Sequence, residues 1–313
     1  MPRRAPCLHA QITPLFEACR IASCAIESCD AEPESMSTLM HRRTLLVIGA
    51  TAAAGAASSR RLPVAAQATA TDLYPSNTAL YLDPALVEGV DYGRRYRRHQ
   101  VFDDSLAQGT ELVRSVIIAP HGGGIEPGTS ELCLAIAGYD PATLVARFGD
   151  AALRDYWMFE GLRGSGNAAL HVTSSHCDDG VALALCAGAW NALALHGCAT
   201  ATVGLPDDSR TVLVGGRQNE LKQRLLSAFD DACIEALDAS NVEAIDGDSP
   251  ANIANRTLLG MGGHLELTGP LRQAMFEVNT RTDRKNTTTE LFWRFVAACR
   301  TALTEVEASQ PIL

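Results

Sequence analysis

The chain has 313 residues, of which 47% are hydrophobic and 20% are charged, and its formal net charge is −10 at pH 7. This is an ordinary globular composition, with enough apolar residues for one substantial core or two small ones. The negative charge argues against nucleic acid as a partner. It permits an anionic substrate, because a local group of positive charges can outweigh the global balance.

An export signal is predicted near the N-terminus. The pair Arg42-Arg43 precedes a modest apolar stretch, and residues 65–68 (Ala-Ala-Gln-Ala) supply a small-x-small cleavage site. Residues 40–68 are therefore interpreted as a bacterial twin-arginine signal peptide, which takes the precursor to the twin-arginine export machinery. The stretch is short and rich in Ala and Gly, which argues against a permanent membrane anchor. We expect a periplasmic or secreted protein.

The predicted signal also divides the chain. Residues 1–39 show no clear periodicity, and Met36 and Met40 stand where a signal of this kind should begin. We expect translation to start at one of these methionines, so that residues 1–39 are a mis-assigned extension. Residues 69–313 contain no internal repeat and no low-complexity linker, and they are expected to form one domain.

Cysteines in this domain can pair if the protein reaches an oxidising compartment. They do not form a Cys-x-x-Cys pair, so a cysteine-based structural zinc site is not expected. Six cysteines allow 15 complete pairings, and the sequence does not choose among them. They are Cys133, Cys177, Cys186, Cys198, Cys233 and Cys299.

Predicted strands and helices alternate along residues 69–313. Strands are expected over 113–119, 155–161, 168–173, 191–196, 211–215 and 264–267. Helices are expected over 84–88, 129–136, 141–149, 180–187, 219–239 and 288–303, and a turn is expected over 269–273. This alternation predicts an α/β fold with an open mixed, mostly parallel sheet and helices on both faces.

Local signals set the expected ends of the helices. Thr129 or Ser130 is expected to cap the helix that follows it, and Asp140 is expected to cap the next one, with Pro141 in the first helical position. The long helix carries an apolar stripe that starts at Leu221 and continues to its end.

The most informative motif is a glycine-rich loop within residues 116–131, which read Val-Ile-Ile-Ala-Pro-His-Gly-Gly-Gly-Ile-Glu-Pro-Gly-Thr-Ser-Glu. An apolar strand is expected to stop at Pro120, and His121 and Glu126 follow at once. An imidazole and a carboxylate on a tight turn at a strand end make a good half-site for zinc. The alternatives are a phosphate-binding glycine loop and a plain turn, although the loop lacks the Gly-Lys-Ser/Thr ending of a P-loop.

A catalytic zinc ion usually has three protein ligands and one open position. His196 ends an apolar strand and precedes a glycine, as His121 does, and ligands in open α/β sheets bind at the carboxyl ends of strands. His196 is therefore the predicted third ligand. His171 is the alternative third ligand, although it is equally interpreted as a core histidine bonded to backbone. His176 is interpreted as a loop residue near the site.

Metal-assisted hydrolysis also needs a base that takes a proton from the metal-bound water. Glu266 alternates with Leu265 and Leu267, so it faces away from them on a strand and shares its face with His264. A lone carboxylate on a half-buried strand is either paired structurally or catalytic. Arg272 follows just beyond a turn and could hold a substrate carboxylate with two hydrogen bonds.

These motifs occur in a recognisable order. They are residues 119–131, Phe-Glu-Gly at 159–161, Leu-His-Val-Thr-Ser-Ser-His at 170–176, Leu-His-Gly at 195–197, Val-Gly-Gly at 214–216, and Leu-Glu-Leu at 265–267 with Arg272. From about Tyr92 to Arg272 the chain resembles the poly-γ-glutamate hydrolase family, first associated with bacteriophages and related to zinc carboxypeptidases. The chain departs from that pattern in its export signal and in Cys177 and Cys198, which lie near motif histidines.

The resemblance implies a carboxypeptidase-type open α/β fold and one zinc ion. It implies that His121 and Glu126 are the first two ligands, that His196 is the later histidine and that Glu266 is the general base. The expected activity is that of a zinc-dependent amidohydrolase that cleaves γ-glutamyl amide bonds of poly-γ-glutamate or a related glutamyl polymer. Arg272 and Arg256 are expected to bind the α-carboxylates of that substrate.

Two alternatives remain at the level of sequence. A peptidoglycan-directed zinc amidase or carboxypeptidase would keep the zinc and change the substrate. A non-catalytic secreted binding module would keep only the fold, but the presence of Glu266 together with all the candidate ligands argues against it.

Overall fold

The computed structural model describes residues 72–99, 115–149, 153–242 and 244–310. The predicted signal peptide, the expected start at Met36 or Met40 and the first two residues of the strand predicted over 113–119 lie outside these ranges. In the ranges that are described, no helix combines the length and the apolar character that crossing a membrane requires.

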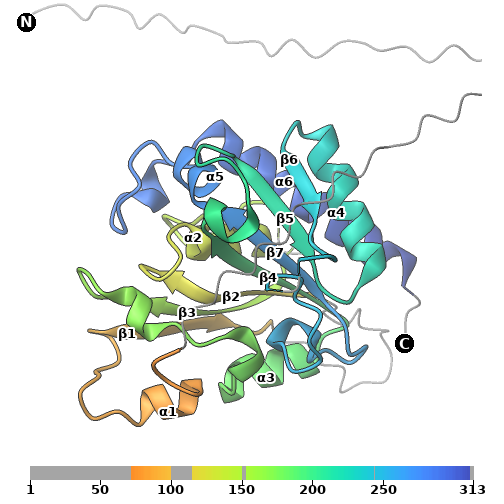
Figure 1. The fold of residues 1–313 in the computed structure, drawn as a ribbon. Coiled ribbons are helices and arrows are strands. Elements are labelled where there is room, and N and C mark those ends of the chain that lie inside the picture. The colour runs from red at the N-terminus through yellow and green to blue at the C-terminus, as the bar shows by residue number, and fades with distance from the viewer. Residues whose placement is uncertain (1–71, 100–114, 150–152, 243, 311–313) are drawn as a thin grey trace, which may run out of the picture. The chain divides into compact units, whose positions relative to one another are not determined.

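In the part of the chain that the structure describes, seven strands form one open sheet at the centre of the fold (Figure 1). In chain order they are β1 (Tyr92–Arg97), β2 (Ser115–Gly123), β3 (Asp155–Gly161), β4 (Asn191–Cys198), β5 (Thr211–Gly215), β6 (Glu235–Asp238) and β7 (Gly263–Thr268). Their order in the sheet is β1-β3-β2-β4-β7-β5-β6. Strands β3, β2, β4 and β7 are parallel, β1 and β5 are antiparallel to β3 and β7, and β6 is parallel to β5.

Helices cover both faces of this sheet. They are α1 (Asn77–Tyr81), α2 (Thr129–Ala137), α3 (Gly180–Ala187), α4 (Asn219–Asp231), α5 (Gly269–Ala274) and α6 (Glu290–Ser309). Helices α2, α4 and α6 pack on one face around Leu193 and Leu265, and α1 and α3 pack on the other around Ile118 and Trp157 (Figure 1). The predicted fold class, an open mixed sheet with helices on both faces, is confirmed.

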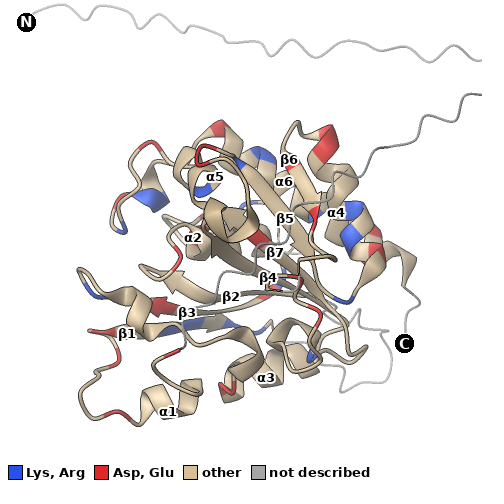
Figure 2. Ribbon diagram, in the orientation of Figure 1, with Lys and Arg blue, Asp and Glu red and all other residues tan. Residues whose placement is uncertain are grey.

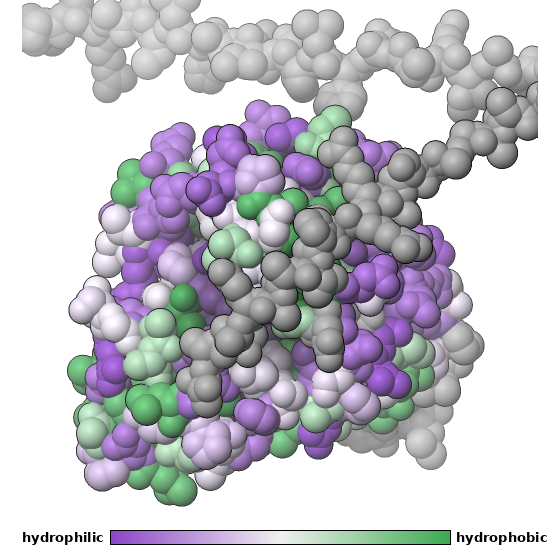
Figure 3. Space-filling view, viewed as in Figure 1, coloured by the Kyte–Doolittle hydropathy of each residue, from purple (hydrophilic) through white to green (hydrophobic). Residues whose placement is uncertain are grey.

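The segment around α1 carries apolar side chains on its outer surface. Leu82 and Val90 are exposed, and hydrophobic residues gather over this part of the molecule in Figure 3. The inner side is anchored by Leu80, which is fully buried, and by Tyr81, whose ring stacks on that of Tyr92 with 5.4 Å between centroids.

The helix predicted over 84–88 is wrong. That stretch forms turns, and the helix lies earlier, where Ser76 caps it.

Strand β2 continues past its predicted end at Pro120 and reaches Gly123. Proline has no N–H to donate to a neighbouring strand, so it is tolerated in a sheet mainly at bulges and edges. The pairing of β2 with β3 shifts register between Ala119 and Gly122, which places Pro120 in such an irregularity. As a result His121 belongs to the strand itself, at its carboxyl end.

The strand predicted over 168–173 is wrong. A short 3-10 helix, η2 (Asn167–Leu170), stands there instead. The Asn167 side chain accepts a hydrogen bond from the Arg163 N–H at 3.0 Å and donates one to the Arg163 carbonyl at 2.9 Å, and this closed turn competes with an extended backbone. The apolar pattern that predicted a strand comes from Leu170 and Val172, which are buried in the core beneath α3.

The helix predicted over 141–149 is also wrong. The Asp140 carboxylate accepts hydrogen bonds from backbone N–H groups of the following turn, as a helix cap would. However, the Asp140 N–H donates to the Val145 carbonyl at 2.9 Å and closes the chain into a loop. Leu144 adopts a φ of 59° within it, which a helix does not allow.

The helix predicted over 219–239 is too long, because α4 ends at Asp231. Cys233 has a φ of 53°, which turns the chain, and Leu237 then lies in β6 rather than on the helix. The buried face of α4 is formed by the predicted stripe as far as Phe229.

Smaller differences concern helix ends and thiols. The turn expected over 269–273 is the short helix α5, and α6 extends to Ser309. Helix α2 begins after Gly128, and neither Thr129 nor Ser130 caps it. The Ser130 hydroxyl instead accepts a hydrogen bond from Gly123 N–H at 2.8 Å, which ties α2 to the end of β2. The six cysteines of residues 69–313 are free thiols, so none of the possible disulfide pairings is formed.

Candidate metal centre

A tight loop after β2 brings His121 and Glu126 together. The Glu126 N–H donates to the His121 carbonyl at 2.8 Å, and His121 Nδ1 lies 3.0 Å from Glu126 Oε1. Gly123 has a φ of +66°, and a Cβ at this position would lie 2.4 Å from the Gly161 carbonyl oxygen. The loop therefore needs a glycine at this position to turn so sharply.

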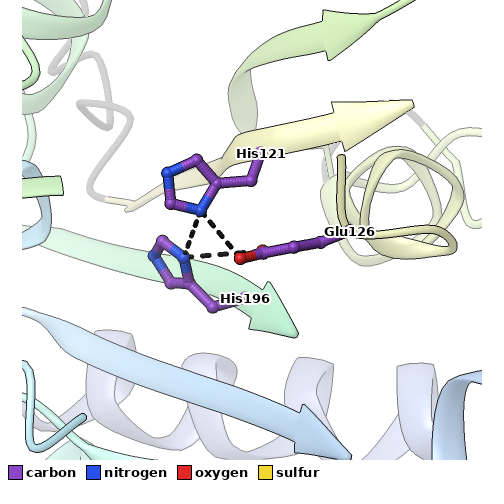
Figure 4. A group of neighbouring side chains, drawn as sticks. All are labelled: His121, Glu126 and His196. Carbon is purple, nitrogen blue, oxygen red and sulfur yellow. Dashed lines mark hydrogen bonds and ion pairs between the residues drawn. The ribbon is translucent and has the colours of Figure 1, made fainter. Parts of the chain in front are cut away.

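The neighbouring strand β4 adds His196 (Figure 4). Its Nδ1 lies 3.0 Å from His121 Nδ1 and 3.7 Å from Glu126 Oε2. One donor atom from each of the three residues lies within 4.8 Å of the others. Both imidazole rings are buried, and the carboxylate is nearly so. The structure thus joins His121, Glu126 and His196 in one group of potential metal ligands.

Other contacts orient this group. His121 Nε2 lies 2.8 Å from the Val172 carbonyl, to which it can only donate, and His196 Nε2 lies 3.2 Å from Ser174 Oγ. The Gly197 N–H donates to Glu126 Oε2 at 2.8 Å. Partners of this kind fix the ring orientation of metal-binding histidines. Here they leave both Nδ1 atoms facing the carboxylate, an arrangement of electron-pair donors that suits a cation.

The electrostatics of the group favour one positive charge beside Glu126. Burial lowers the pKa of His196 well below its ordinary value, and the neighbouring His264 and His121 lower it further. Burial also opposes charge on His121, but Glu126, the Val172 carbonyl and Glu266 together outweigh it, so the pKa of His121 is raised. His196 is therefore held neutral, which is the form of imidazole that binds metals.

Glu266 lies next to this group on β7. It is directly opposite His196 in the register of β4 and β7, whereas Leu265 and Leu267 point into the core on the other face. His264 Nε2 lies 3.1 Å from Glu266 Oε1, and the His264 ring stacks on that of His196 with 4.4 Å between centroids. Burial raises the pKa of Glu266, although the hydrogen bond to His264 opposes the shift.

His171 approaches the centre from its solvent side. Its ring lies 3.9 Å from that of His121 between centroids, and its Nε2 is 3.9 Å from Glu126 Oε1. Its Nδ1 lies 2.7 Å from Asp72 Oδ1, and 35% of its side chain is exposed. His171 follows η2 rather than a strand, and it lies outside the compact group that contains His196. His176 is exposed, 3.8 Å from Asp72.

The two predicted substrate-binding arginines are placed differently. Arg272 on α5 is largely buried, and its guanidinium donates to the Leu267 carbonyl at 3.1 Å and to the Pro127 carbonyl at 3.0 Å. It lies against Gly197, where a Cβ would come within 2.4 Å of Arg272 Cζ. Arg256 is exposed after the 3-10 helix η5 (Ile253–Asn255), and the contacts seen in the described ranges do not link it to the three donors.

Comparison with known proteins identifies the family. The family model for poly-gamma-glutamate hydrolase matches residues 104–298, which is more than half of the chain. The chain belongs to the poly-γ-glutamate hydrolase family. The resemblance inferred from the motifs is confirmed.

Curated relatives of this hydrolase-family chain occur in Bacillus subtilis (strain 168). The SPbeta prophage-derived UPF0714 protein YoqZ is 33% identical over 184 residues, and the UPF0714 protein YndL is 30% identical over 186 residues. The alignments cover 59% and 58% of this chain, and 60% and 63% of the two relatives. The chain thus spans less than two thirds of the length of these relatives.

Solved structures show the same fold. A bacteriophage poly-gamma-glutamate hydrolase superposes with a TM-score of 0.62 at 28% sequence identity, over 77% of this chain and 100% of that one. A zinc-free apo form of YndL superposes with a TM-score of 0.59 at 26% identity, over 75% of this chain and 99% of that one.

Sequence reasoning missed two residues of the candidate site. Ser174, which contacts His196, lies inside the Leu-His-Val-Thr-Ser-Ser-His motif, so its position was a usable signal. Asp72 orients His171 from 99 positions away, and nothing around it in the sequence marks that role.

Proposed function

We propose that this chain is a zinc-dependent amidohydrolase that cleaves γ-glutamyl amide bonds of poly-γ-glutamate or a related glutamyl polymer. The observation that carries the proposal is the buried group of His121, Glu126 and His196 beside Glu266. Membership of the family supports the substrate class, and the zinc-free form of the relative YndL supports zinc as the metal.

The three donors suit a single zinc ion. Two imidazole nitrogens and a carboxylate oxygen are a ligand set found in catalytic zinc sites, where the fourth position stays open. His121, Glu126 and His196 would hold the ion. When bound, it would supply Lewis-acid polarisation of the amide carbonyl and lower the pKa of water at the open position.

Glu266 is the proposed general base. Its carboxylate accepts a proton from water as the water oxygen attacks the amide carbonyl carbon, and it gives that proton to the leaving nitrogen as the C–N bond breaks. His264 holds Oε1, and within the described ranges Oε2 has no hydrogen-bond partner, so Oε2 is the oxygen available to the water. Because burial raises the pKa of Glu266, the carboxylate takes up a proton more readily than an exposed glutamate would.

Arg272 is the proposed contact for a substrate carboxylate. Every unit of a γ-linked glutamyl chain carries a free α-carboxylate, which the planar guanidinium matches in shape and charge. Nε and Nη1 of Arg272 are bonded to backbone carbonyls, whereas Nη2 meets no acceptor in the ranges that the structure describes. Arg256, which is exposed after η5, is proposed as a more distant carboxylate contact.

The proposal is tested by incubating zinc-loaded protein with purified poly-γ-glutamate and, in parallel, with peptidoglycan. We expect the polyglutamate chains to shorten, as measured by size-exclusion chromatography, and the peptidoglycan to remain intact. Release of peptidoglycan fragments without shortening of polyglutamate would favour a cell-wall amidase or carboxypeptidase. No cleavage of either polymer would defeat the proposed activity.

Replacing Gly197 with alanine should displace Arg272. The new Cβ would lie 2.4 to 2.7 Å from guanidinium atoms, which are the flexible end of the side chain, so the backbone can stay in place. We expect KM for γ-linked glutamate oligomers to rise about 10- to 100-fold, which is the loss of affinity expected when one or two hydrogen bonds to a charged group are removed. Thermal unfolding should show that the variant is folded.

Gly180→Ala is the matched control, because a Cβ at Gly180 meets nothing within 4 Å and should leave KM unchanged. If KM stayed the same in Gly197→Ala as well, Arg272 would not be a substrate contact.

Removal of the metal should destabilise the fold. A metal that is present at 100 times its Kd adds about 2.7 kcal/mol to the free energy of unfolding. We therefore expect EDTA to lower Tm and added Zn²⁺, but not Mg²⁺, to restore it, because the nitrogen donors suit zinc better. An unchanged Tm after complete removal of the metal, checked by elemental analysis, would argue against this site.

We also propose export through the twin-arginine pathway, on the strength of Arg42-Arg43 and the cleavage site near Ala68. N-terminal sequencing of the mature protein should give a start near residue 69, and peptides from before Met36 in the precursor would contradict the expected start.

A further inference from the structure

A cavity of about 570 Å³ lies beside the metal-binding loop, and the chemistry above does not use it. Three segments line it: the loop after β2 at Gly124, residues 163–168 after β3, and Arg281, Thr282 and Arg284 around the start of the 3-10 helix η6 (Arg284–Asn286). Figure 2 shows basic positions on the latter two segments.

The cavity and the metal centre share a wall. Gly124 stands between His121 and Glu126 in the loop, and a Cβ at Gly124 would lie 2.4 Å from Asn167 Nδ2. Asn167 thus packs directly against the loop that presents two of the three donors. Asn167 also begins η2, and the residue after η2 is His171. An extended chain that crosses the metal centre would therefore reach this cavity within a short distance.

The cavity is positively charged. Arg163, Arg281 and Arg284 line it, and the lining residues in the described ranges include no carboxylate. Arg163 Nε donates to Asp91 Oδ1 at 2.8 Å, and Nε of the buried Arg284 donates to Glu131 Oε1 at 3.2 Å. Arg281 is exposed and forms no ion pair with any residue that the structure describes. Arg281 is therefore the guanidinium that is free to bind an anion, because the charges of Arg163 and Arg284 are balanced by their carboxylate partners.

The backbone keeps the entrance open. A Cβ at Gly164 or at Gly166 would meet nothing within 4 Å, and Gly166 has a φ of +72°. The Ser165 hydroxyl lies on the same lining and can donate a hydrogen bond. The Thr282 hydroxyl, also on the lining, already donates to Asp283 Oδ2 at 3.3 Å. Exposed hydrogen-bond donors around a cationic cavity suit a carboxylate that belongs to a longer polymer, because the rest of the polymer can remain outside the cavity.

We propose that this cavity is a subsite for an α-carboxylate of the glutamyl polymer, at a unit removed from the bond that is cut, with Arg281 as its main contact and Arg163 beside it. The inference rests on the proposed function. It explains how a chain with a formal net charge of −10 holds a polyanion, because the unpaired guanidinium of Arg281 attracts a carboxylate locally. It also predicts that longer γ-linked chains bind more tightly than dimers.

The test measures binding in the Glu266→Gln background, in which turnover should not consume the ligand. The probe is a γ-linked glutamate hexamer, and Kd is measured by isothermal titration calorimetry. Arg281→Gln should raise Kd about tenfold, as expected for the loss of a charge-assisted hydrogen bond. Arg163→Gln should raise it to a lesser degree, and the effect of Arg281→Gln should shrink in high salt.

Arg217→Gln is the matched control. Arg217 is exposed, donates to the Asp248 carbonyl at 3.1 Å and is not among the residues that line the cavity, so its loss removes the same charge outside the cavity and should leave Kd unchanged. A hexamer with amidated α-carboxyl groups should bind weakly and equally to the parent and to Arg281→Gln.

The outcomes separate the two proposals. An unchanged Kd for the hexamer in both Arg281→Gln and Arg163→Gln overturns the subsite, even if the wild-type protein shortens polyglutamate. Failure of the wild-type protein to shorten polyglutamate overturns the proposed function itself. A tenfold effect at Arg281 that is absent at Arg217 and absent with the amidated hexamer supports the subsite.

Discussion

Replacing Glu266 with glutamine is expected to lower kcat on poly-γ-glutamate by about 10²- to 10⁴-fold, the range that general acid–base catalysis contributes. Glutamine has nearly the same shape as glutamate, but its amide cannot take a proton from water or return one to the leaving nitrogen. The side chain lies opposite His196 on the neighbouring strand, so the loss affects the step at the metal centre directly.

The same substitution should leave the metal and the fold in place. Glu266 is not one of the three donors that lie within 4.8 Å of one another, so zinc content per chain should equal that of the parent protein. Burial raises the pKa of Glu266, which means that its charged form is costly inside the protein. A neutral amide removes that cost, and we expect Tm to stay the same or rise.

These two expectations are checked by steady-state kinetics and by elemental analysis of the purified variant. Glu220→Gln is the control, because Glu220 is an exposed carboxylate on α4 and its loss should leave both kcat and zinc content unchanged. Full activity in Glu266→Gln would show that another group moves the proton. Loss of zinc in this variant would instead make Glu266 a ligand.

The convergence of His121, Glu126 and His196 was predictable because its signals are local. His121 and Glu126 stand on one glycine-rich loop, and His196 repeats the same order of apolar run, histidine and glycine. Parallel strands place such positions at one edge of the sheet, so the alternation of strands and helices was enough to expect their convergence. Side chains alternate between the two faces of a strand, so the sequence also predicted that Glu266 points away from Leu265 and Leu267.

Contacts between distant segments were not predictable in this way. Asp72 reaches His171 across 99 positions, and the carboxylates that hold Arg163 and Arg284 come from separate parts of the chain. No periodicity or spacing in a single sequence encodes such pairs. They arise only once the sheet has set the positions of the loops at its carboxyl edge.

The errors in secondary structure have a common physical cause. At 168–173 an apolar pattern that looks like a strand reflects burial beneath α3, while the side chain of Asn167 closes a turn. Beyond Asp231 the apolar stripe of α4 continues in sequence, but Cys233 turns the chain and the remainder joins the sheet as β6. Apolar periodicity shows which residues are buried. A single turn residue can decide whether those residues lie in a helix, a strand or a loop.

Replacing His196 with alanine is expected to remove the metal, whereas replacing His171 with alanine is expected to leave it bound. His196 Nδ1 lies 3.0 Å from His121 Nδ1 and 3.7 Å from Glu126 Oε2, so it completes the compact group of donors. His171 lies outside that group and has its Nδ1 turned toward Asp72 at 2.7 Å. Loss of His196 should therefore weaken metal binding much more than loss of His171.

Loss of a partner that only surrounds a metal site weakens metal affinity by about 10- to 100-fold, and loss of a ligand weakens it more. We expect His171→Ala to remain within that range and to keep stoichiometric zinc after gel filtration, while His196→Ala loses zinc and activity together. Competition with a chelator of known affinity measures both variants on one scale. Since the His196 ring also packs against that of His264, circular dichroism must show that His196→Ala is folded before its zinc content is interpreted. If His171→Ala loses zinc while His196→Ala retains it, the third ligand is His171, and the centre must rearrange around the loop of His121 and Glu126 when the ion binds.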